Sequence, residues 1–202
     1  MYLVCVLITA LLMLVGAIDY IRRAWIRETN PVLATWILIV LTMALSFWMY
    51  WNSSKKSLAG NIGLISALGN TVTILAGVLL VHVRANTLRI AFDKTQKWCL
   101  VLASGILVIW LLSKAPLACY ALVQCIALVG YFATAKRLWR AKQSTEPVFV
   151  WTVVLLACLS ALYPAWVKKD LFAWIFLCRG IPSTACMLCL IVRAKRKSHL
   201  LS

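Results

Sequence analysis

The sequence predicts an all-α integral membrane protein with seven transmembrane helices, arranged as two parallel three-helix repeats joined by a linker helix. Three observations predict this fold class. Of the 202 residues, 64% are apolar, whereas an ordinary soluble domain is about half apolar. Apolar stretches recur along the whole chain, and one pattern of basic residues, Trp and Pro occurs twice in the same order.

Each apolar stretch is long enough to cross a bilayer whose hydrocarbon core is about 30 Å thick. Charged residues, Pro or Asn bound the stretches on either side. The predicted helices are residues 2–18, 32–51, 58–83, 95–112, 117–135, 148–167 and 171–192. Because few residues lie between them, the sequence leaves no room for a soluble catalytic or regulatory domain.

The first helix, residues 2–18, is expected to be retained rather than removed as a signal peptide. No basic residue precedes it, whereas Arg22, Arg23 and Arg27 follow it. A signal peptide has the opposite order, with its positive charges before the apolar stretch. This order also favours a helix that starts outside the cell.

The basic residues are distributed unevenly around the other helices. Fifteen of the 21 Lys and Arg follow the first, third, fifth and seventh helices, five lie in the remaining connections, and the last is Arg179. Because cytoplasmic loops carry an excess of Lys and Arg, the N-terminus is predicted outside and the C-terminus in the cytoplasm. Membrane topology therefore accounts for the net charge of +16, and we expect no nucleic-acid partner.

The repeated pattern lies at the start of the second and sixth helices. Residues 20–31 and 136–147 both combine basic residues with a Trp and a Pro. An apolar helix follows each of them and opens with a Trp, Trp36 in the first copy and Trp151 in the second. Repeats of this length, built from hydrophobic helices, are typical of small transporters.

Three helices, a linker helix and three further helices are the simplest division of the chain. The first repeat comprises residues 1–83, the linker helix with its flanking loops residues 84–116, and the second repeat with the basic C-terminal tail residues 117–202. A helix between the repeats is required, because three crossings alone would invert the second copy.

Two motifs carry a resemblance to a known family. They are Thr29-Asn30-Pro31, followed by Trp36, and Ser144-Thr145-Glu146-Pro147, followed by Trp151. With the three-plus-one-plus-three plan, they resemble the SWEET and PQ-loop transporter superfamily, most closely small bacterial membrane proteins of that type. The resemblance implies a multi-pass protein of the bacterial inner membrane that transports a small solute.

The family's hinge prolines are missing from this chain. No Pro-Gln pair occurs in the sequence, and Gly16-Ala17 and Ala133-Thr134 stand where the first and fifth helices would carry it. Pro31 and Pro147, at the starts of the second and sixth helices, are instead expected to break helices or to take part in gating.

Arg179 is the strongest candidate for a binding residue. It lies about eight residues into the seventh predicted helix. A charge inside a membrane costs about 2.5–3.5 kcal/mol on insertion scales, so it usually faces a partner or an aqueous cavity. Arg179 therefore favours a solute with a carboxylate or phosphate. The alternative is that it snorkels, or bonds backbone carbonyls that Pro182 leaves free.

Asn70 is the second candidate. Aligning the basic ends of the third and seventh helices places Gly69-Asn70 opposite Cys178-Arg179. Gly69, Gly180 and Pro182 are expected to weaken both helices at this level, and interrupted helices at matching positions indicate a transporter site. The resemblance also implies a polar substrate site here, where the family typically uses asparagines.

Gln124 is the third candidate, in the middle of the fifth helix. It is expected either to contact the solute or to bond a neighbouring helix, as polar residues in membrane helices often do. The hydroxyls of Thr42, Ser46 and Ser160 more often bond the carbonyl one turn earlier in their own helix.

The sequence contains no sign of a cofactor, a metal site or an enzymatic activity. Metalloprotease, phosphate-loop and Ser-His-Asp motifs are absent, and the eight Cys all fall within predicted helices, where they pack as small apolar residues. The five acids, Asp19, Glu28, Asp93, Glu146 and Asp170, lie at helix ends or in loops. A membrane interior without a carboxylate argues against proton coupling.

The sequence therefore predicts a passive transporter, a uniporter or exchanger, for a small polar or anionic solute. The alternative is a membrane protein that does not transport: a scaffold, an immunity-type protein or a subunit of a larger complex. The expected partners are the lipid bilayer, the solute and further copies of the chain.

Overall fold

The computed structural model describes residues 1–29, 31–53, 57–87, 90, 92, 94–140 and 146–199. The regular elements of these residues are α1 (Tyr2–Trp25), α2 (Leu33–Trp51), α3 (Ile62–Arg84), α4 (Lys94–Ser113), α5 (Pro116–Arg140), α6 (Val148–Ser160), α7 (Leu162–Lys168) and α8 (Leu171–His199). All are α-helices, as predicted. Asn30, Asp93, Ser144 and Thr145, which the sequence analysis named, lie outside the described residues.

Six helical stretches of the described chain are long and apolar enough to cross a membrane. They are α1, α2, α3, α4, residues Val148–Lys168 and residues Leu171–Arg196. In α5 the apolar part found among the described residues is shorter, Pro116–Val129. The structure is thus that of an all-α, multi-pass membrane protein, and the seventh span stays a prediction.

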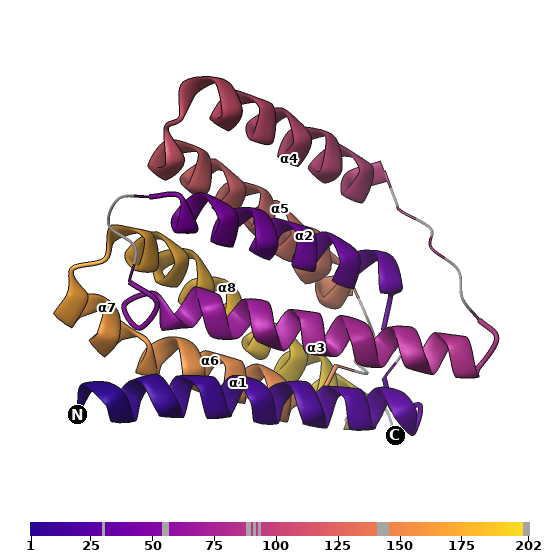
Figure 1. Ribbon diagram of the computed structural model, residues 1–202. Coiled ribbons are helices and arrows are strands. Elements are labelled where there is room, and N and C mark those ends of the chain that lie inside the picture. Colours follow the sequence, from indigo (N-terminus) through magenta and orange to yellow (C-terminus); the bar gives the residue numbers. More distant parts are fainter. Residues whose placement is uncertain are drawn as a thin grey trace.

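The predicted helix 148–167 is divided into α6 and α7 at Ala161. Pro164 explains the division, because a proline has no N–H and cannot donate to the carbonyl four residues earlier, which belongs to Ser160. The amides of Ala161 and Ala165 still bond carbonyls one turn before them, so α7 continues close to the direction of α6 (Figure 1).

The helices lie side by side in one bundle (Figure 1). We call its two ends the Met1 end, where α1, α3, α5 and α8 begin, and the Trp25 end, where α1 stops. Helix α3 packs against both α1 and α2, and α8 packs against both α5 and α6. Two further pairs, α1 with α6 and α2 with α5, join these groups, while α4 lies outside against α5.

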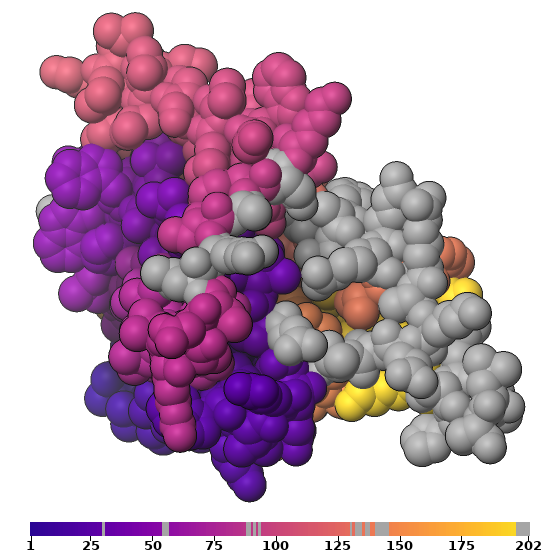
Figure 2. All heavy atoms as spheres, turned by 90° about the vertical axis from the view of Figure 1, so that its right-hand side faces the viewer, coloured from indigo at the N-terminus to yellow at the C-terminus, as the bar shows by residue number. Residues whose placement is uncertain are grey.

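The surface of the bundle is apolar, the reverse of a soluble protein. On α1 the exposed side chains include Leu3, Leu7 and Leu11, whereas Thr9 and Met13 are buried. At the Trp25 end, the tips of α1 and α3 lie on one side and parts of α5 and α8 on the other (Figure 2). Lipid is the environment that this distribution fits.

The close packing of α1 on α3 depends on Gly77. A Cβ atom added there would lie 2.5 Å from Cγ1 of Ile21, and Ile is stiff at its first side-chain torsion. We therefore expect Gly77→Ala to lower the free energy of unfolding in detergent by about 1–3 kcal/mol, through overpacking.

Gly69→Ala is the matched control, since nothing lies within 4 Å of the Cβ it would add to the same helix. Alanine favours helix by about 1 kcal/mol over glycine, so this variant should be as stable as the parent protein or more so. Equal melting temperatures for the two variants would mean that α3 leaves room for a methyl group beside Ile21.

Candidate functional site

Arg179 lies in the third turn of α8, and its side chain is enclosed rather than lipid-facing. The residue is 9% exposed, and its Nε donates to Oε1 of Gln124 at 3.0 Å. Its guanidinium carbon lies 5.0 Å from the ring centroid of Phe176 and 5.6 Å from that of Tyr131. Aromatic faces attract cations at these distances. Arg179 therefore does not snorkel, and none of its side-chain partners among the described residues is a backbone carbonyl.

Gln124 joins three helices. Its Nε2 donates to Oγ of Ser46 on α2 at 2.8 Å, while its Oε1 accepts from Arg179 on α8. Ser46 in turn donates to the carbonyl of Thr42, one turn earlier in α2. This arrangement fits the interpretation of Gln124 as an interhelical residue, and it also fixes the position of the Arg179 guanidinium.

No carboxylate of the described residues pairs with Arg179. Both salt bridges found there belong to Arg23, which holds Asp19 at 2.7 Å and Glu28 at 2.9 Å. Asp170 instead accepts hydrogen bonds from Tyr50 and from the amide of Ala173. A buried guanidinium whose charge no carboxylate neutralises attracts an anion, because its charge is costly in a medium of low dielectric constant.

A second polar group lies nearer the Met1 end, around Asp170. Asp170 is 6% exposed; its Oδ1 accepts from the amide of Ala173 at 3.1 Å and its Oδ2 from the hydroxyl of Tyr50 at 2.8 Å. The same hydroxyl lies 2.6 Å from the carbonyl oxygen of Ser57. Asp170 thus caps α8 and ties it to the end of α2.

Asn61 and Tyr120 lie next to this group, and both are fully buried. The Tyr120 hydroxyl lies beside the Asn61 side chain and within electrostatic range of Arg179 and Asp170. The hydroxyl and the Asn61 side chain are near each other without good hydrogen-bond geometry, and Nη2 of Arg179 has no hydrogen-bond partner in the described part of the chain. Leaving a buried donor such as Nη2 unsatisfied costs about 1–3 kcal/mol.

Together these side chains form a line of buried polar groups from the Met1 end to Arg179, which we call the polar column. Its members are Asn61, Asp170, Tyr50, Tyr120, Ser46, Gln124 and Arg179.

The half of the column at the Met1 end was not predicted. One signal could have found it: Asn61 and Asp170 each lie nine residues before the aligned candidates Asn70 and Arg179.

The structure does not bring Asn70 into the column's hydrogen bonds, although its buried Oδ1 has no partner among the described residues. The expected interruptions are absent, since α3 runs through Gly69 and α8 through Gly180 and Pro182. Next to the proline, the Ser183 hydroxyl donates to the carbonyl of Arg179 at 2.7 Å. The gating roles of these residues stay predictions.

The repeat-motif residues open helices as expected. Pro147 is the N-cap residue of α6, and Pro31 immediately precedes Val32, the N-cap residue of α2. Trp36 packs edge-on against Tyr20, with ring centroids 5.0 Å apart.

Trp151 packs edge-on against Tyr131, with ring centroids 6.3 Å apart. Tyr131 also lies beneath the guanidinium of Arg179, so this copy of the motif is in contact with the polar column.

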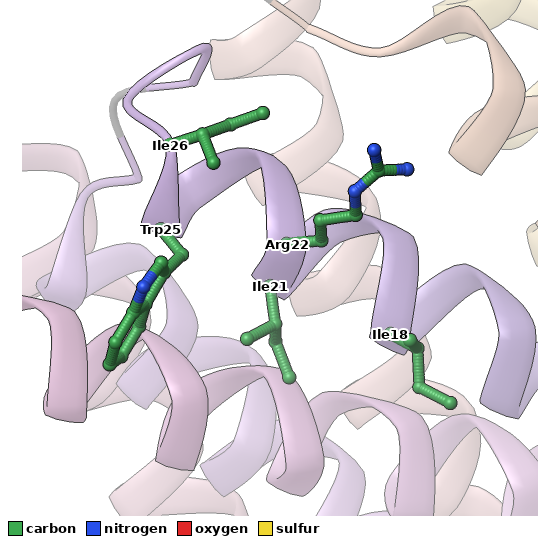
Figure 3. Close-up of a pocket in the computed structure, with 5 residues that line it drawn as sticks. All are labelled: Ile18, Ile21, Arg22, Trp25 and Ile26. Carbon is green, nitrogen blue, oxygen red and sulfur yellow. The ribbon is translucent and has the colours of Figure 1, made fainter.

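A shallow pocket of about 320 Å³ lies elsewhere, against the last turns of α1 (Figure 3). It is lined by Ile18, Ile21, Arg22, Trp25 and Ile26. Four of the five side chains are apolar, and none belongs to the polar column. Its chemistry is that of a membrane-facing surface rather than of a solute site.

The cysteines form no metal site in the described residues, where no three His, Cys, Asp or Glu side chains come together. Cys186 and Cys189 are both free and exposed, whereas the sequence predicted that they pack as small apolar residues.

Compared with known proteins, the chain matches no family model, no curated protein and no solved structure.

Proposed function

We propose that the protein is a passive transporter, a uniporter or exchanger, for a small polar or anionic solute, and that the polar column binds this solute. The buried charge of Arg179 carries the proposal. The guanidinium has no carboxylate partner among the described residues, and its Nη2 is a buried donor without an acceptor. A carboxylate or phosphate would supply both the negative charge and the hydrogen-bond acceptor, since arginine binds such groups through paired N–H donors.

The proposal includes the architecture expected from the sequence, with two parallel repeats around α4, the N-terminus outside and the C-terminus in the cytoplasm. Its support is the pairing of helices. The proposed repeats relate α1 to α5, α2 to α6 and α3 to α8. When these helices are exchanged, each main packing contact between repeat helices becomes another one: α1–α3 becomes α5–α8, α2–α3 becomes α6–α8, and α1–α6 becomes α5–α2. The α3–α8 pair maps onto itself, whereas the packing of α4 on α5 has no counterpart of similar extent.

Two interhelical hydrogen bonds follow the same exchange. The hydroxyls of Thr9 on α1 and Ser160 on α6 lie 2.7 Å apart, and Gln124 on α5 bonds Ser46 on α2. Thr9 and Gln124 are 115 residues apart, the spacing that also relates the two motif tryptophans.

At the Trp25 end, two stacked Arg–Trp pairs also correspond to each other under this exchange of helices. The guanidinium carbon of Arg84 lies 4.6 Å from the ring centroid of Trp25, and that of Arg193 lies 3.7 Å from that of Trp139. These duplicated contacts support a place in the SWEET and PQ-loop superfamily, and with it a bacterial inner membrane.

Passive transport is proposed because Asp170, the one carboxylate of the column, is already engaged. Both of its oxygens accept hydrogen bonds, from Tyr50 and from the start of α8. Binding a coupling proton would break this cap, so Asp170 is better suited to hold α8 than to carry protons.

The test is a thermal-shift screen of the detergent-purified protein with carboxylates, phosphates, sugars and amino acids, run beside Arg179→Ala. A ligand at a hundred times its Kd stabilises the folded protein by about 2.7 kcal/mol. We expect an anion to raise the melting temperature of the parent protein and to leave that of Arg179→Ala unchanged. Uptake of the same anion into proteoliposomes should then disappear in the variant.

Arg84→Ala is the control. It removes an arginine that stacks on Trp25 and lies outside the column, so it should keep the anion response. If no compound class stabilises the parent protein, or if both variants respond as the parent does, Arg179 is not an anion site.

The alternative is a non-transporting scaffold, immunity-type protein or subunit, and the position of α4 favours it. This helix packs mainly on α5 and exposes Val101, Leu102, Val108 and Leu112. Another copy of the chain or another membrane protein could pack against this apolar face of α4. A negative screen, with a stable oligomer in mild detergent, would favour this alternative.

A further inference from the structure

We propose that the site at Arg179 takes an organic monoanion, with a single carboxylate, in preference to a dianion of the same size. This inference rests on the proposed function, in which Arg179 binds the anionic group of the solute. It adds the number of negative charges that the solute carries. It thereby narrows the solute to monocarboxylates rather than dicarboxylates or phosphate monoesters, which carry close to two charges.

The first support is the balance of charge inside the bundle. Only two charged residues are buried in the described part of the chain, Asp170 and Arg179. Both lie within electrostatic range of the Tyr120 hydroxyl, so both charges act inside the polar column. Because they are opposite, a bound monoanion leaves the column with one net negative charge and a dianion leaves it with two. Each uncompensated charge is costly in a medium of low dielectric constant.

The second support is that the groups around the Arg179 guanidinium provide no further positive charge. Gln124 accepts from its Nε, and the rings of Phe176 and Tyr131 lie 5.0 and 5.6 Å from its central carbon. On the side of α6, Cys158 lies within electrostatic range of it. These amide, aromatic and thiol groups do not neutralise a second carboxylate.

The third support is the hydrogen-bonding capacity that Arg179 has left. Its Nε is committed to Gln124, whereas its Nη2 is buried without a partner among the described residues. One carboxylate satisfies this donor. A second carboxylate on the same solute would lose its hydrogen bonds to water and gain no cationic partner. Since a buried charged group without partners costs more than a neutral one, the other end of the solute has to be neutral.

The other basic residues of the described chain are not buried, and two of them stack on rings near the ends of the bundle. The Arg193 guanidinium lies 3.7 Å from the ring centroid of Trp139 at the Trp25 end. Arg193 is fourteen residues beyond Arg179, roughly 21 Å along the axis of α8. Lys168, the last residue of α7, lies over the ring of Tyr2 at the Met1 end. Neither is placed to pair with a second anionic group beside Arg179.

The test uses three molecules of nearly the same shape that differ in charge. Malonamide is neutral, malonamate has one carboxylate, and malonate has two, both ionised at about pH 8. Binding of each molecule to the detergent-purified protein is measured by calorimetry. We expect malonamate to bind most tightly, malonate about tenfold more weakly, and malonamide not at all.

The expected factor follows from the charge of Asp170. This residue lies nine positions before Arg179, roughly 13 Å along the axis of α8. At that distance and an effective dielectric constant of about 20, the repulsion of one further negative charge lowers affinity about tenfold.

Asp170→Asn tests this repulsion directly. It removes the negative charge and keeps an oxygen that can cap α8. Because Asp170 repels a dianion twice as strongly as a monoanion, malonate should gain more affinity than malonamate, and the preference should shrink. An unchanged preference would overturn the role of the Asp170 charge.

The other variants concern the arginine itself. Arg179→Ala should bind neither malonamate nor malonate. If it does not fold, Arg179→Lys replaces it. This variant keeps a single positive charge and should keep the preference for malonamate. Arg84→Ala, outside the column, should show the same order of affinities as the parent protein.

The outcomes separate the inference from the function on which it rests. If malonate binds the parent protein as tightly as malonamate and both are lost in Arg179→Ala, the monoanion inference is overturned and the anion site remains. Equal binding of malonamide and malonamate would show that charge is not recognised, and would overturn the proposed function as well. Binding of none of the three would mean that a small carboxylate does not reach Arg179, and would overturn both.

Discussion

Gln124→Glu is expected to abolish anion binding while making the folded protein more stable. The new carboxylate would lie where the amide oxygen now accepts from Arg179 at 3.0 Å, and so would form an internal ion pair. An incoming anion would then meet a neutralised guanidinium, and we expect its affinity to fall more than a hundredfold. Pairing a buried charge that has no carboxylate partner among the described residues should raise the free energy of unfolding, by about 1 kcal/mol after the loss of the Nε2 bond to Ser46.

Calorimetric titration and thermal unfolding of the same detergent preparation measure both effects. Gln124→Leu is the control, since it keeps the volume but removes the bonds to Ser46 and Arg179. It should lower stability by about 2–3 kcal/mol, by leaving polar partners unsatisfied, and yet retain an anion response. Normal anion binding by Gln124→Glu would show that the free charge of Arg179 is not what attracts the solute.

Asp170→Ala is expected to lower the free energy of unfolding by about 2–4 kcal/mol. The substitution removes the cap of α8 at the amide of Ala173, which is typically worth about 1 kcal/mol. It also removes the acceptor of the buried Tyr50 hydroxyl at 2.8 Å, and hydrogen bonds to charged groups contribute about 1.5–3 kcal/mol.

Asp170→Asn is the matched control for thermal unfolding in detergent. Its amide oxygen can still cap the helix, so most of the stability should remain. A large loss in both variants would mean that the negative charge, rather than the hydrogen bonds, holds the start of α8. No loss in either would mean that the ends of α2 and α8 are held together by their apolar contacts.

The helices could be predicted from the sequence because the bilayer fixes their length and composition. Arg179 and Gln124 were found for a related reason, since each is a strongly polar residue within an apolar stretch. Their mutual contact was not predicted, because the sequence does not say which faces of α5 and α8 meet.

The sequence alone could not identify Asn61, Tyr50 and Tyr120 as members of the polar column. Tyrosine and asparagine near helix ends usually lie at the membrane–water interface, and only the packing of α2, α3 and α5 in the bundle turns these residues inward. The expected interruptions failed for a different reason. Glycine and proline lower the intrinsic stability of a helix, but neighbouring helices satisfy or shield the affected backbone, so α3 and α8 remain continuous.

In the proposed two-repeat architecture, the two corresponding interhelical bonds differ in a way that bears on how such a protein could evolve. Thr9 and Ser160 join α1 to α6 with hydroxyls alone, whereas Gln124 joins α5 to α2 with one end of its amide and holds Arg179 with the other. The crossing therefore does not need an amide. If the proposed repeats arose by duplication, one copy could keep the hydroxyl–hydroxyl bond while the other acquired an amide that also positions a charge, and a nearly symmetric bundle could in this way come to bind an unsymmetrical molecule.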